Sequence, residues 1–429
     1  MNPSELKAAN SPFGYYGWVI ALVSTLCIVA SIPGQTVGVS VFTNYLMKAY
    51  GLSRTELSLA YLVGTITSAL MLPAAGRILD SIGPRLMILM ASLGLAFFLV
   101  MIANAHHFID GNNLLALGLT TIAFLGIRHF GQGQLTLVSR TVLGRWFLGY
   151  LGTVNGVVGI VISFSFGVAP MALSNLAEGL GWQVGLAVLG GVVILSGLLG
   201  GLFFRSSPEH MGCEIESGLP KRLTKDVPST ASLNLKGAKK TITFWVFNIG
   251  LALQGGIITG FTFHFSGICE ELAIPVAEGF ALFFPMALVA TLVNIIAGFL
   301  ADRIAIKWHV LTMVAALALT PLATPFMAQT WGYAAVALGF GVSGGVFTCL
   351  ISVAWPKLFG RKFLGAISGY ALGCVVFASA VYPYVVSLLK EEFGSLATAV
   401  SLLVVGPIAL IAVILVSWVR LKPYTPATA

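Results

Sequence analysis

Twelve long apolar stretches occupy most of this 429-residue chain. A helix needs about 20 apolar residues to cross the hydrocarbon core of a bilayer. Charged residues make up only 9% of the sequence, whereas a soluble domain has about 25%. We therefore predict an all-α membrane protein with twelve transmembrane helices. The stretches lie near residues 16–48, 54–78, 85–105, 114–139, 150–174, 184–204, 243–269, 275–300, 308–328, 332–355, 364–388 and 396–419.

A short polar motif recurs at the end of two of these stretches. Residues 76–85 read Gly-Arg-Ile-Leu-Asp-Ser-Ile-Gly-Pro-Arg, and residues 298–303 read Gly-Phe-Leu-Ala-Asp-Arg. Its recurrence indicates a duplication into two pseudo-symmetric six-helix bundles. Because an unpaired charge is costly at a membrane and the aspartate occurs twice, we expect these residues to act in gating, the degenerate second copy less than the first. The alternative is a merely structural turn. The gating candidates are Gly76, Asp80, Arg85, Gly298, Asp302 and Arg303.

Two further features support the duplication. The only long polar stretch, residues 206–242, is rich in Pro, Ser, Thr and Lys, and predicts a flexible cytoplasmic linker between bundles at residues 1–205 and 243–429. Residues 151–156 and 364–369, at the start of the fifth and eleventh stretches, share a Gly-x-x-x-Gly pattern. Such spacing lets helix backbones approach closely.

The basic residues predict the orientation of the chain in the membrane. With the N-terminus inside, the outer loops hold only Lys48, Arg54 and Lys390, and Arg128 lies within a span. All the other Lys and Arg then fall on the cytoplasmic side, as the positive-inside rule requires. We predict a multi-pass protein of the plasma (inner) membrane with both termini in the cytoplasm. The net charge of +8 is thereby explained by topology, and no nucleic-acid partner is expected.

Nothing in the sequence indicates catalysis. The five cysteines are scattered, no metal-ligand spacing occurs, and the glycine-rich runs lie within apolar stretches rather than between a strand and a helix. We therefore expect no enzyme activity and no cofactor. A monomer is expected, with the lipid bilayer and a small-molecule substrate as its partners.

Polar side chains within the apolar stretches are the candidates for recognition of a small molecule. Arg128 is the most informative, because a guanidinium at mid-bilayer is costly and its fork matches a carboxylate. The alternative is an arginine held by backbone carbonyls of a neighbouring helix. The substrate-binding candidates are Arg128, Gln132, His264, Gln254, Asn294, Gln35, Asn155, Tyr370 and Tyr382, most of which could equally be polar packing contacts.

Proton coupling has few candidate groups in this chain. Carboxylates or histidines within the membrane usually carry coupled protons, and none of the 15 Asp and Glu residues lies mid-span. Only His264 and His129 could serve. We expect any coupling to run through His264 or through the substrate itself; a counter-anion is the other possible coupled species.

Several motifs resemble those of one transporter family. Residues 76–85 resemble the loop signature Gly-x-x-x-Asp-Arg-x-Gly-Arg-(Arg/Lys) of the major facilitator superfamily, with departures at Ser81 and Pro84. Residues 128–133, Arg-His-Phe-Gly-Gln-Gly, resemble its fourth-helix motif Arg-x-x-Gln-Gly with one extra residue. The resemblance implies the major facilitator fold and transport by alternating access, with Asp80 as a latch on the cytoplasmic side.

The start of the chain resembles one branch of that superfamily. Residues 15–19, Tyr-Tyr-Gly-Trp-Val, are similar to the first helix of the monocarboxylate carriers and oxalate–formate exchangers, as are residues 38–42, 50–54 and 145–147. The branch commonly has an arginine in the eighth helix, where this chain has Asn294. No Lys or Arg occurs at residues 364–388, where the oxalate exchanger uses a lysine.

The resemblance and these departures together favour a small monoanion as the substrate. We predict a secondary active or facilitative transporter of a small organic anion, specifically a monocarboxylate. An exporter of neutral or hydrophobic compounds from the same superfamily is the alternative, and a membrane-embedded enzyme or sensor is less favoured. Symport, antiport and uniport stay open.

Overall fold

The computed structural model describes residues 15–109, 111–217, 219–220, 232–275, 278–279 and 281–423. The described residues form helices and turns, without a strand. Within these residues, eleven helices are long and apolar enough to cross a membrane, and the first apolar stretch divides into two shorter helices. The predicted all-α membrane fold is confirmed. Part of the predicted linker, residues 221–231, lies outside the described residues.

Contacts between residues divide the chain into two compact units. Unit 1 contains residues 1–148, 161–220 and 364–373, and unit 2 contains residues 149–160, 221–363 and 374–429. The start of the eleventh apolar stretch therefore belongs to unit 1, and the start of the fifth belongs to unit 2. The bundle boundaries near residues 205 and 243 stay a prediction.

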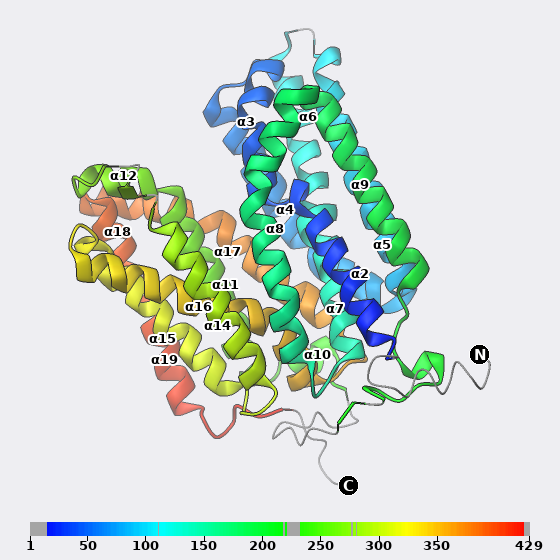
Figure 1. Cartoon of the computed structure of the whole chain (residues 1–429). Coiled ribbons are helices and arrows are strands. Elements are labelled where there is room, and N and C mark those ends of the chain that lie inside the picture. Colours follow the sequence, from blue (N-terminus) through cyan, green and yellow to red (C-terminus); the bar gives the residue numbers. More distant parts are fainter. Residues whose placement is uncertain are drawn as a thin grey trace. The chain divides into compact units, whose positions relative to one another are not determined.

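The first half of the chain contributes most of unit 1 (Figure 1). Its helices are α2 (Gly17–Ala30), η1 (Ile32–Gly34), α3 (Thr36–Tyr50), α4 (Arg54–Ile82), α5 (Pro84–Asn104), η2 (Ala105–Phe108), α6 (Asn113–Gly126), η3 (Ile127–Leu135), α7 (Thr136–Trp146), α8 (Leu151–Leu180), α9 (Trp182–Phe203) and η4 (Glu209–Met211).

The boundaries of α4 follow from its sequence. Ser53 and Glu56 form a reciprocal capping box at its N-terminus, which satisfies backbone donors that have no partner within the helix. At its C-terminus Gly83 adopts φ +81°, a conformation that favours glycine, and Pro84 starts α5 directly. The predicted tight hairpin at residues 83–84 is present.

Small residues let α5 and α9 run side by side in unit 1 (Figure 1). A Cβ atom on Gly197 of α9 would lie 1.8 Å from the Ser92 hydroxyl of α5, and one on Gly190 would touch Ala96. Membrane helices associate mainly through such close packing, because lipid is as apolar as the side chains. The α5–α9 contact in unit 1 therefore depends on close approach of the two backbones rather than on large interlocking side chains.

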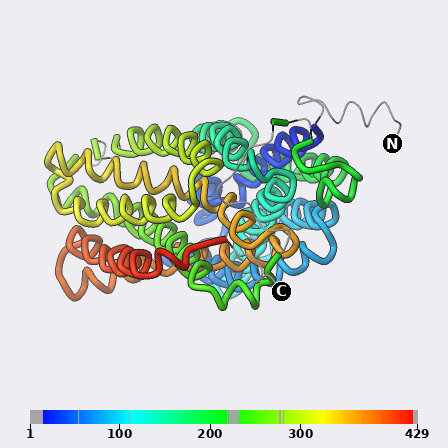
Figure 2. The backbone as a smooth tube through the Cα atoms, turned by 90° about the horizontal axis from the view of Figure 1, so that it is seen from below, coloured from blue at the N-terminus to red at the C-terminus, as the bar shows by residue number. Residues whose placement is uncertain are grey.

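The second half of the chain contributes most of unit 2. Its helices are α10 (Leu235–Ala238), α11 (Ile242–Phe263), α12 (Phe265–Glu271), α14 (Phe283–Ala301), α15 (Lys307–Ala323), η5 (Thr324–Phe326), α16 (Thr330–Phe359), α17 (Leu364–Phe393), α18 (Leu396–Leu402) and α19 (Val405–Val416). The red α18–α19 segment runs along one edge of this unit in Figure 2, and α19 contacts α15.

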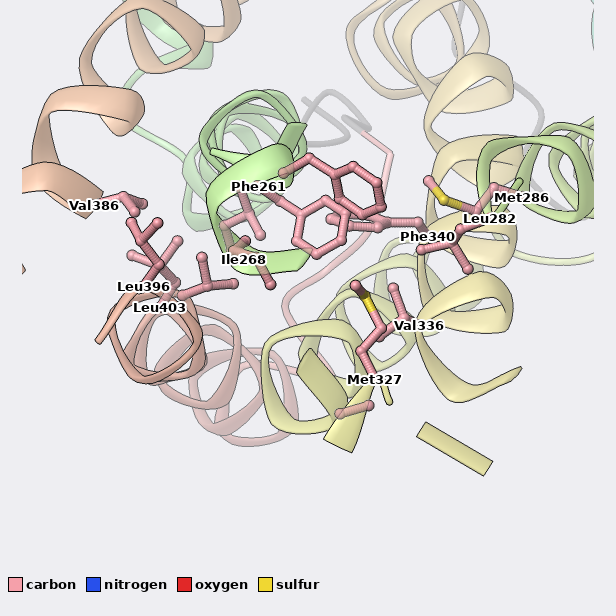
Figure 3. Packing of buried hydrophobic residues seen from close by; sticks show 14 of the residues in the cluster. Phe261, Ile268, Leu282, Met286, Met327, Val336, Phe340, Val386, Leu396 and Leu403 are labelled. Carbon is pink, nitrogen blue, oxygen red and sulfur yellow. The ribbon is translucent and has the colours of Figure 1, made fainter. Parts of the chain in front are cut away.

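An aromatic and aliphatic core fills one end of unit 2. The rings of Phe261 on α11 and Phe340 on α16 lie 4.9 Å apart, centroid to centroid, and both side chains are buried (Figure 3). Met327, Val336 and Leu403 pack around them. This core joins α11, α16 and α18, so the polar positions farther along α11 and α16 lie on a fixed framework.

Candidate functional site

Two helix irregularities meet in unit 1. The first apolar stretch is interrupted at η1, where Pro33 and Gly34 end the α2 helix, and the fourth is a π-helix over η3 rather than an α-helix. A Cβ atom on Gly34 would lie 2.5 Å from the Gly131 Cα of η3, so the two backbones are in direct contact. Irregular backbone is tolerated within a membrane only where protein or a cavity covers it, and π-helical turns are frequent at functional sites.

Arg128 lies at this junction and is 2% exposed. Its Nη1 donates to the Gly34 carbonyl at 3.1 Å and to the Thr36 hydroxyl at 3.3 Å. The Thr36 hydroxyl lies 2.9 Å from the Tyr61 hydroxyl, and the guanidinium carbon lies 5.2 Å from the centroid of the Tyr61 ring. These contacts fix the guanidinium between η1 and α4. The sequence left open that Arg128 is only anchored by a backbone carbonyl. The structure shows such an anchor, at one edge of the guanidinium.

The other edge of the guanidinium has no acceptor. Nε is shielded from water and has no hydrogen-bond partner, and no described residue accepts from Nη2. No described carboxylate pairs with Arg128, whereas the buried cations Arg145 and Lys357 each have an aspartate. Nε and Nη2 form the parallel fork that binds a carboxylate through two hydrogen bonds. The protein thus holds Nη1 and leaves the fork unsatisfied.

The π-helix explains the spacing of its polar residues. Its hydrogen bonds run from residue i to i+5, which accommodates one more residue per turn than an α-helix. This chain has one more residue between Arg128 and Gln132 than the superfamily motif. The wider turn of the π-helix accommodates that residue, so Gln132 remains on about the same side of the helix as Arg128. Gln132 is half-buried and its Oε1 has no partner.

The contact between Gly34 and Gly131 gives a stability prediction. Gly34→Ala would place a methyl group 2.5 Å from the Gly131 Cα and 2.7 Å from the Ile127 carbonyl, and neither backbone atom can rotate away. We expect a loss of about 1–3 kcal/mol in the free energy of unfolding and a weaker Arg128 anchor. Thermal unfolding of the purified protein measures the loss. Gly118→Ala on α6 is the control, because a Cβ there meets nothing within 4 Å; an equal effect of both changes would contradict the prediction.

Three of the predicted residues converge on α16 in unit 2. A Cβ on Gly344 would lie 3.9 Å from the Gln254 Nε2, and one on Gly345 would lie 2.9 Å from the backbone nitrogen of Asn294. The Asn155 amide donates to the Thr348 carbonyl at 3.3 Å. Glycines 344 and 345 therefore bring α11 and α14 close to α16, with polar side chains at the junction.

These amides are incompletely satisfied. Asn294 is 2% exposed, and neither atom of its amide has a hydrogen-bond partner among the described residues. The Gln254 Oε1 is likewise buried without a partner. A buried polar atom without a partner costs about 1–3 kcal/mol. The amides of Gln254 and Asn294 are thus available to bind a polar ligand or water.

The remaining predicted substrate-binding residues have packing or local contacts. The His264 Nε2 lies 2.9 Å from the Pro383 carbonyl of α17, and the Gln35 amide donates to the Ser31 hydroxyl at 3.0 Å. The Tyr382 ring packs on Gly256 of α11. Tyr370 is half-buried on the part of α17 that belongs to unit 1.

Asp80 of α4 caps the N-terminus of α17 within unit 1. Its carboxylate accepts from the backbone nitrogens of Gly365 at 2.9 Å and Ala366 at 2.7 Å. Gly76 makes this possible, because a Cβ there would lie 2.2 Å from the Gly365 carbonyl oxygen. Arg145 forms an ion pair with the same carboxylate at 2.6 Å. An anion at a helix N-terminus is stabilised by the free N–H groups and the helix dipole.

Asp302 makes the equivalent contacts in unit 2. It accepts from the backbone nitrogens of Gly152 and Thr153 at 2.9 and 2.8 Å and from the Thr153 hydroxyl at 2.8 Å. Lys357 pairs with it at 3.1 Å. Gly298 allows the approach, since a Cβ there would lie 2.3 Å from the Gly152 carbonyl oxygen. The second motif, although degenerate in sequence, has one more hydrogen bond than the first.

The basic residues within the two motifs do not pair with the aspartates. Arg85 donates to the Phe204 carbonyl at the end of α9, and Arg303 donates to the Phe299 carbonyl and covers that ring. The partners are Arg145 and Lys357, which sequence reasoning missed. One signal marks both: a basic residue followed two positions later by phenylalanine, shortly before each Leu-Gly pair that opens α8 and α17.

The fold and these paired sites define a family. The model of the Major Facilitator Superfamily matches residues 19–383. The chain therefore belongs to the Major Facilitator Superfamily of membrane transporters. Among characterised relatives, "Monocarboxylate transporter 10" of Danio rerio is 24% identical over 436 aligned positions, which cover 95% of this chain and 78% of that protein.

Solved structures of this superfamily have the same fold. The human organic anion transporter MFSD10 matches with a TM-score of 0.61 at 14% identity, over 92% of this chain and 99% of that one. The proton:xylose symporter XylE matches with a TM-score of 0.67 at 14% identity, over 95% and 96%. A bacterial homologue of the iron transporter ferroportin matches with a TM-score of 0.68 at 16% identity, over 92% and 98%.

Proposed function

We propose that this protein transports a small organic monoanion, a monocarboxylate, by alternating access. The observation that carries the proposal is the Arg128 guanidinium, buried within a span with no acidic partner and with its carboxylate-binding edge unsatisfied. A buried cation without a counter-ion is costly, and an anionic substrate would supply that counter-ion. The likeness to a monocarboxylate transporter supports the same substrate class.

The polar groups described in unit 2 favour one carboxylate rather than two. In the described parts of unit 2, the polar groups gathered at α16 are the neutral amides of Asn155, Gln254 and Asn294, and the buried Lys357 is already paired with Asp302. Neutral amides can hydrogen-bond to a hydroxyl or a carbonyl but do not balance a second charge. We propose Gln254 and Asn294 as the substrate-binding residues of unit 2, where their amides can bind uncharged polar groups.

Direct uptake measurements test the proposed function. Protein in proteoliposomes is offered labelled lactate, pyruvate, formate, oxalate, xylose or nitrate. We expect uptake of the monocarboxylates, with oxalate and xylose at the level of protein-free vesicles. Uptake of xylose, or of a hydrophobic dye, without uptake of any carboxylate would contradict the proposal and favour a carrier of neutral compounds.

The orientation is proposed on the distribution of charge. Placing both termini in the cytoplasm leaves Lys48, Arg54 and Lys390 as the basic residues of the outer loops. We propose two six-helix bundles, residues 1–205 and 243–429, joined by a cytoplasmic linker at residues 206–242. We propose the plasma membrane as the location and a monomer as the working form.

A further inference from the structure

We propose that His129, next to Arg128 on the π-helix, takes up the proton that accompanies the transported anion. The inference rests on the proposed function and adds its coupling. His129 is 6% exposed, and its Nε2 lies 2.9 Å from the Nε2 of Gln134. The Gln134 Oε1 is shielded from water and has no hydrogen-bond partner among the described residues. These two side chains are the polar pair nearest in sequence to the anion-binding group.

The pair exists because this segment is a π-helix. Residues i and i+5 are hydrogen-bonded neighbours in a π-helix, whereas an α-helix pairs i with i+4. His129 and Gln134 are five residues apart, and η3 covers both. A regular α-helix would turn these two side chains away from each other. The unusual helix therefore produces the His129–Gln134 pair.

The pair can hold the imidazole in either protonation state. When the ring is neutral, Nδ1 carries its proton and the Nε2 lone pair accepts from the Gln134 amide N–H. When a proton from water binds that lone pair, Nε2–H becomes a donor, and a half-turn of the amide presents Oε1 as its acceptor. One hydrogen bond is exchanged for another, no covalent bond other than N–H forms, and the ring gains one positive charge. The unpartnered Oε1 is the atom that this second state requires.

The charges around His129 favour joint binding of a proton and an anion. Arg128 is the adjacent cation, and Tyr61 of α4 faces it. The α5, α6 and η1 helices packed on η3 have no ionisable side chain within the spans, apart from Arg85 at the start of α5. Next along α7 are Arg140 and Arg145, the latter paired with Asp80. A protonated His129 would add a second positive charge one residue after Arg128 in the sequence, and a bound anion would offset it.

The net charge of the site follows from this arrangement. The empty site carries the single charge of Arg128, a bound monoanion cancels it, and a bound proton restores it. The loaded and the empty carrier then have the same charge, so reorientation moves no net charge across the membrane. Anion binding and proton binding strengthen each other by the same factor, as linkage requires. This geometry points to electroneutral symport of one proton with one monocarboxylate.

The His264 ring lacks these features. Its Nε2 lies 2.9 Å from the Pro383 carbonyl and 3.4 Å from the Ser387 hydroxyl. Among the described residues, the partners of this nitrogen include no side-chain amide that could reverse a hydrogen bond as Gln134 can. The structure consequently favours His129 over the histidine that the sequence pattern suggested.

Proteoliposomes that contain a pH-sensitive dye test this inference with lactate as the probe. Wild-type protein is expected to take up about one proton per lactate. In His129→Gln, uptake of lactate driven by a pH gradient should fall, and the factor of this loss should be at least about ten times that of lactate–lactate exchange measured at equal pH. The number of protons taken up per lactate should be near zero. The exposed His107→Gln serves as the matched control and should behave as wild type.

Two results would overturn the inference. One is a proton count of about one in His129→Gln, and the other is loss of proton uptake in His264→Gln with His129→Gln normal. If His129→Gln folds poorly, Gln134→Leu is the second variant, because it keeps the imidazole ring but removes its hydrogen-bond acceptor. It should move the midpoint of the pH dependence of uptake to lower pH. An unchanged midpoint would also overturn the inference. Failure of the wild type to transport any monocarboxylate is a separate outcome, which removes the proposed substrate class itself.

Discussion

Arg128→Gln is expected to abolish carboxylate transport while the protein still folds. The substitution removes a buried guanidinium that no described carboxylate pairs with, and glutamine can still donate toward the Gly34 carbonyl. Without the guanidinium nothing offsets the lost hydration of a carboxylate at that depth. We expect no uptake of lactate or pyruvate above protein-free vesicles.

Arg128→Lys separates charge from geometry at the same position. Lysine keeps the positive charge but loses the Nε–Nη2 fork, and a hydrogen bond to a charged group contributes about 1.5–3 kcal/mol. Binding should therefore weaken about ten- to a hundredfold, since each 1.4 kcal/mol is a factor of ten. Stabilisation of the purified protein by lactate against heat, titrated over concentration, measures this change.

Protein yield distinguishes a binding arginine from a structural one. Arg77→Gln, an exposed cation on α4, is the control and should change neither yield nor the lactate-induced shift in unfolding temperature. A binding role predicts that Arg128→Gln has near wild-type yield and no shift. Low yield, with the shift retained in the protein that does fold, would show that Arg128 serves only to hold η1 against η3.

The sequence predicted those features that are written locally. The tight hairpin at residues 83–84 follows from one glycine and one proline, and the cap at Ser53 follows from its spacing to Glu56. The recurrence of Asp80 and Asp302 marked both capping sites, because an aspartate at the end of an apolar stretch is costly unless it has partners. A break in the first apolar stretch was likewise visible in Pro33.

Features that depend on distant residues could not be predicted from the sequence. Nothing local to Arg145 or Lys357 shows that each lies beside an aspartate more than fifty residues earlier in the chain. The π-helix was hidden as well, since only one extra residue in a short motif signals it. One edge of the Arg128 guanidinium is hydrogen-bonded and the other is not, because the Gly34 carbonyl of another helix accepts only from Nη1.

The two aspartates are expected to differ in their importance for stability. Asp302 is 0% and Lys357 1% exposed, whereas Asp80 and Arg145 are 13% and 9% exposed. Removing one partner of a buried ion pair costs about 3–5 kcal/mol, because the other charge is left without compensation. Asp302→Asn should approach this loss, and Asp80→Asn should lose less because water reaches its pair. Thermal unfolding of both variants in the same detergent gives the comparison.

We propose that both sites act as latches on the helix starts that they cap, so transport should fall in both variants. Asparagine offers one acceptor oxygen where aspartate offers two, so Asp80→Asn releases one of the Gly365 and Ala366 nitrogens and removes the ion pair with Arg145. We expect lactate uptake to fall by at least about tenfold at nearly normal yield. Normal uptake by Asp80→Asn would exclude the latch.

Replacing both charges of the unit 2 pair tests whether the charge itself matters there. A buried ion pair exchanged for apolar groups of similar volume is often neutral or stabilising, because no charge is left unpaired. Asp302→Asn with Lys357→Met should therefore recover much of the stability that Asp302→Asn alone loses. Uptake should stay low in the double variant, because Asp302 also accepts from two backbone nitrogens and the hydroxyl at the start of α8. Recovery of uptake together with stability would mean that the pair contributes to folding alone, and that the capped helix start of α8 has no part in gating.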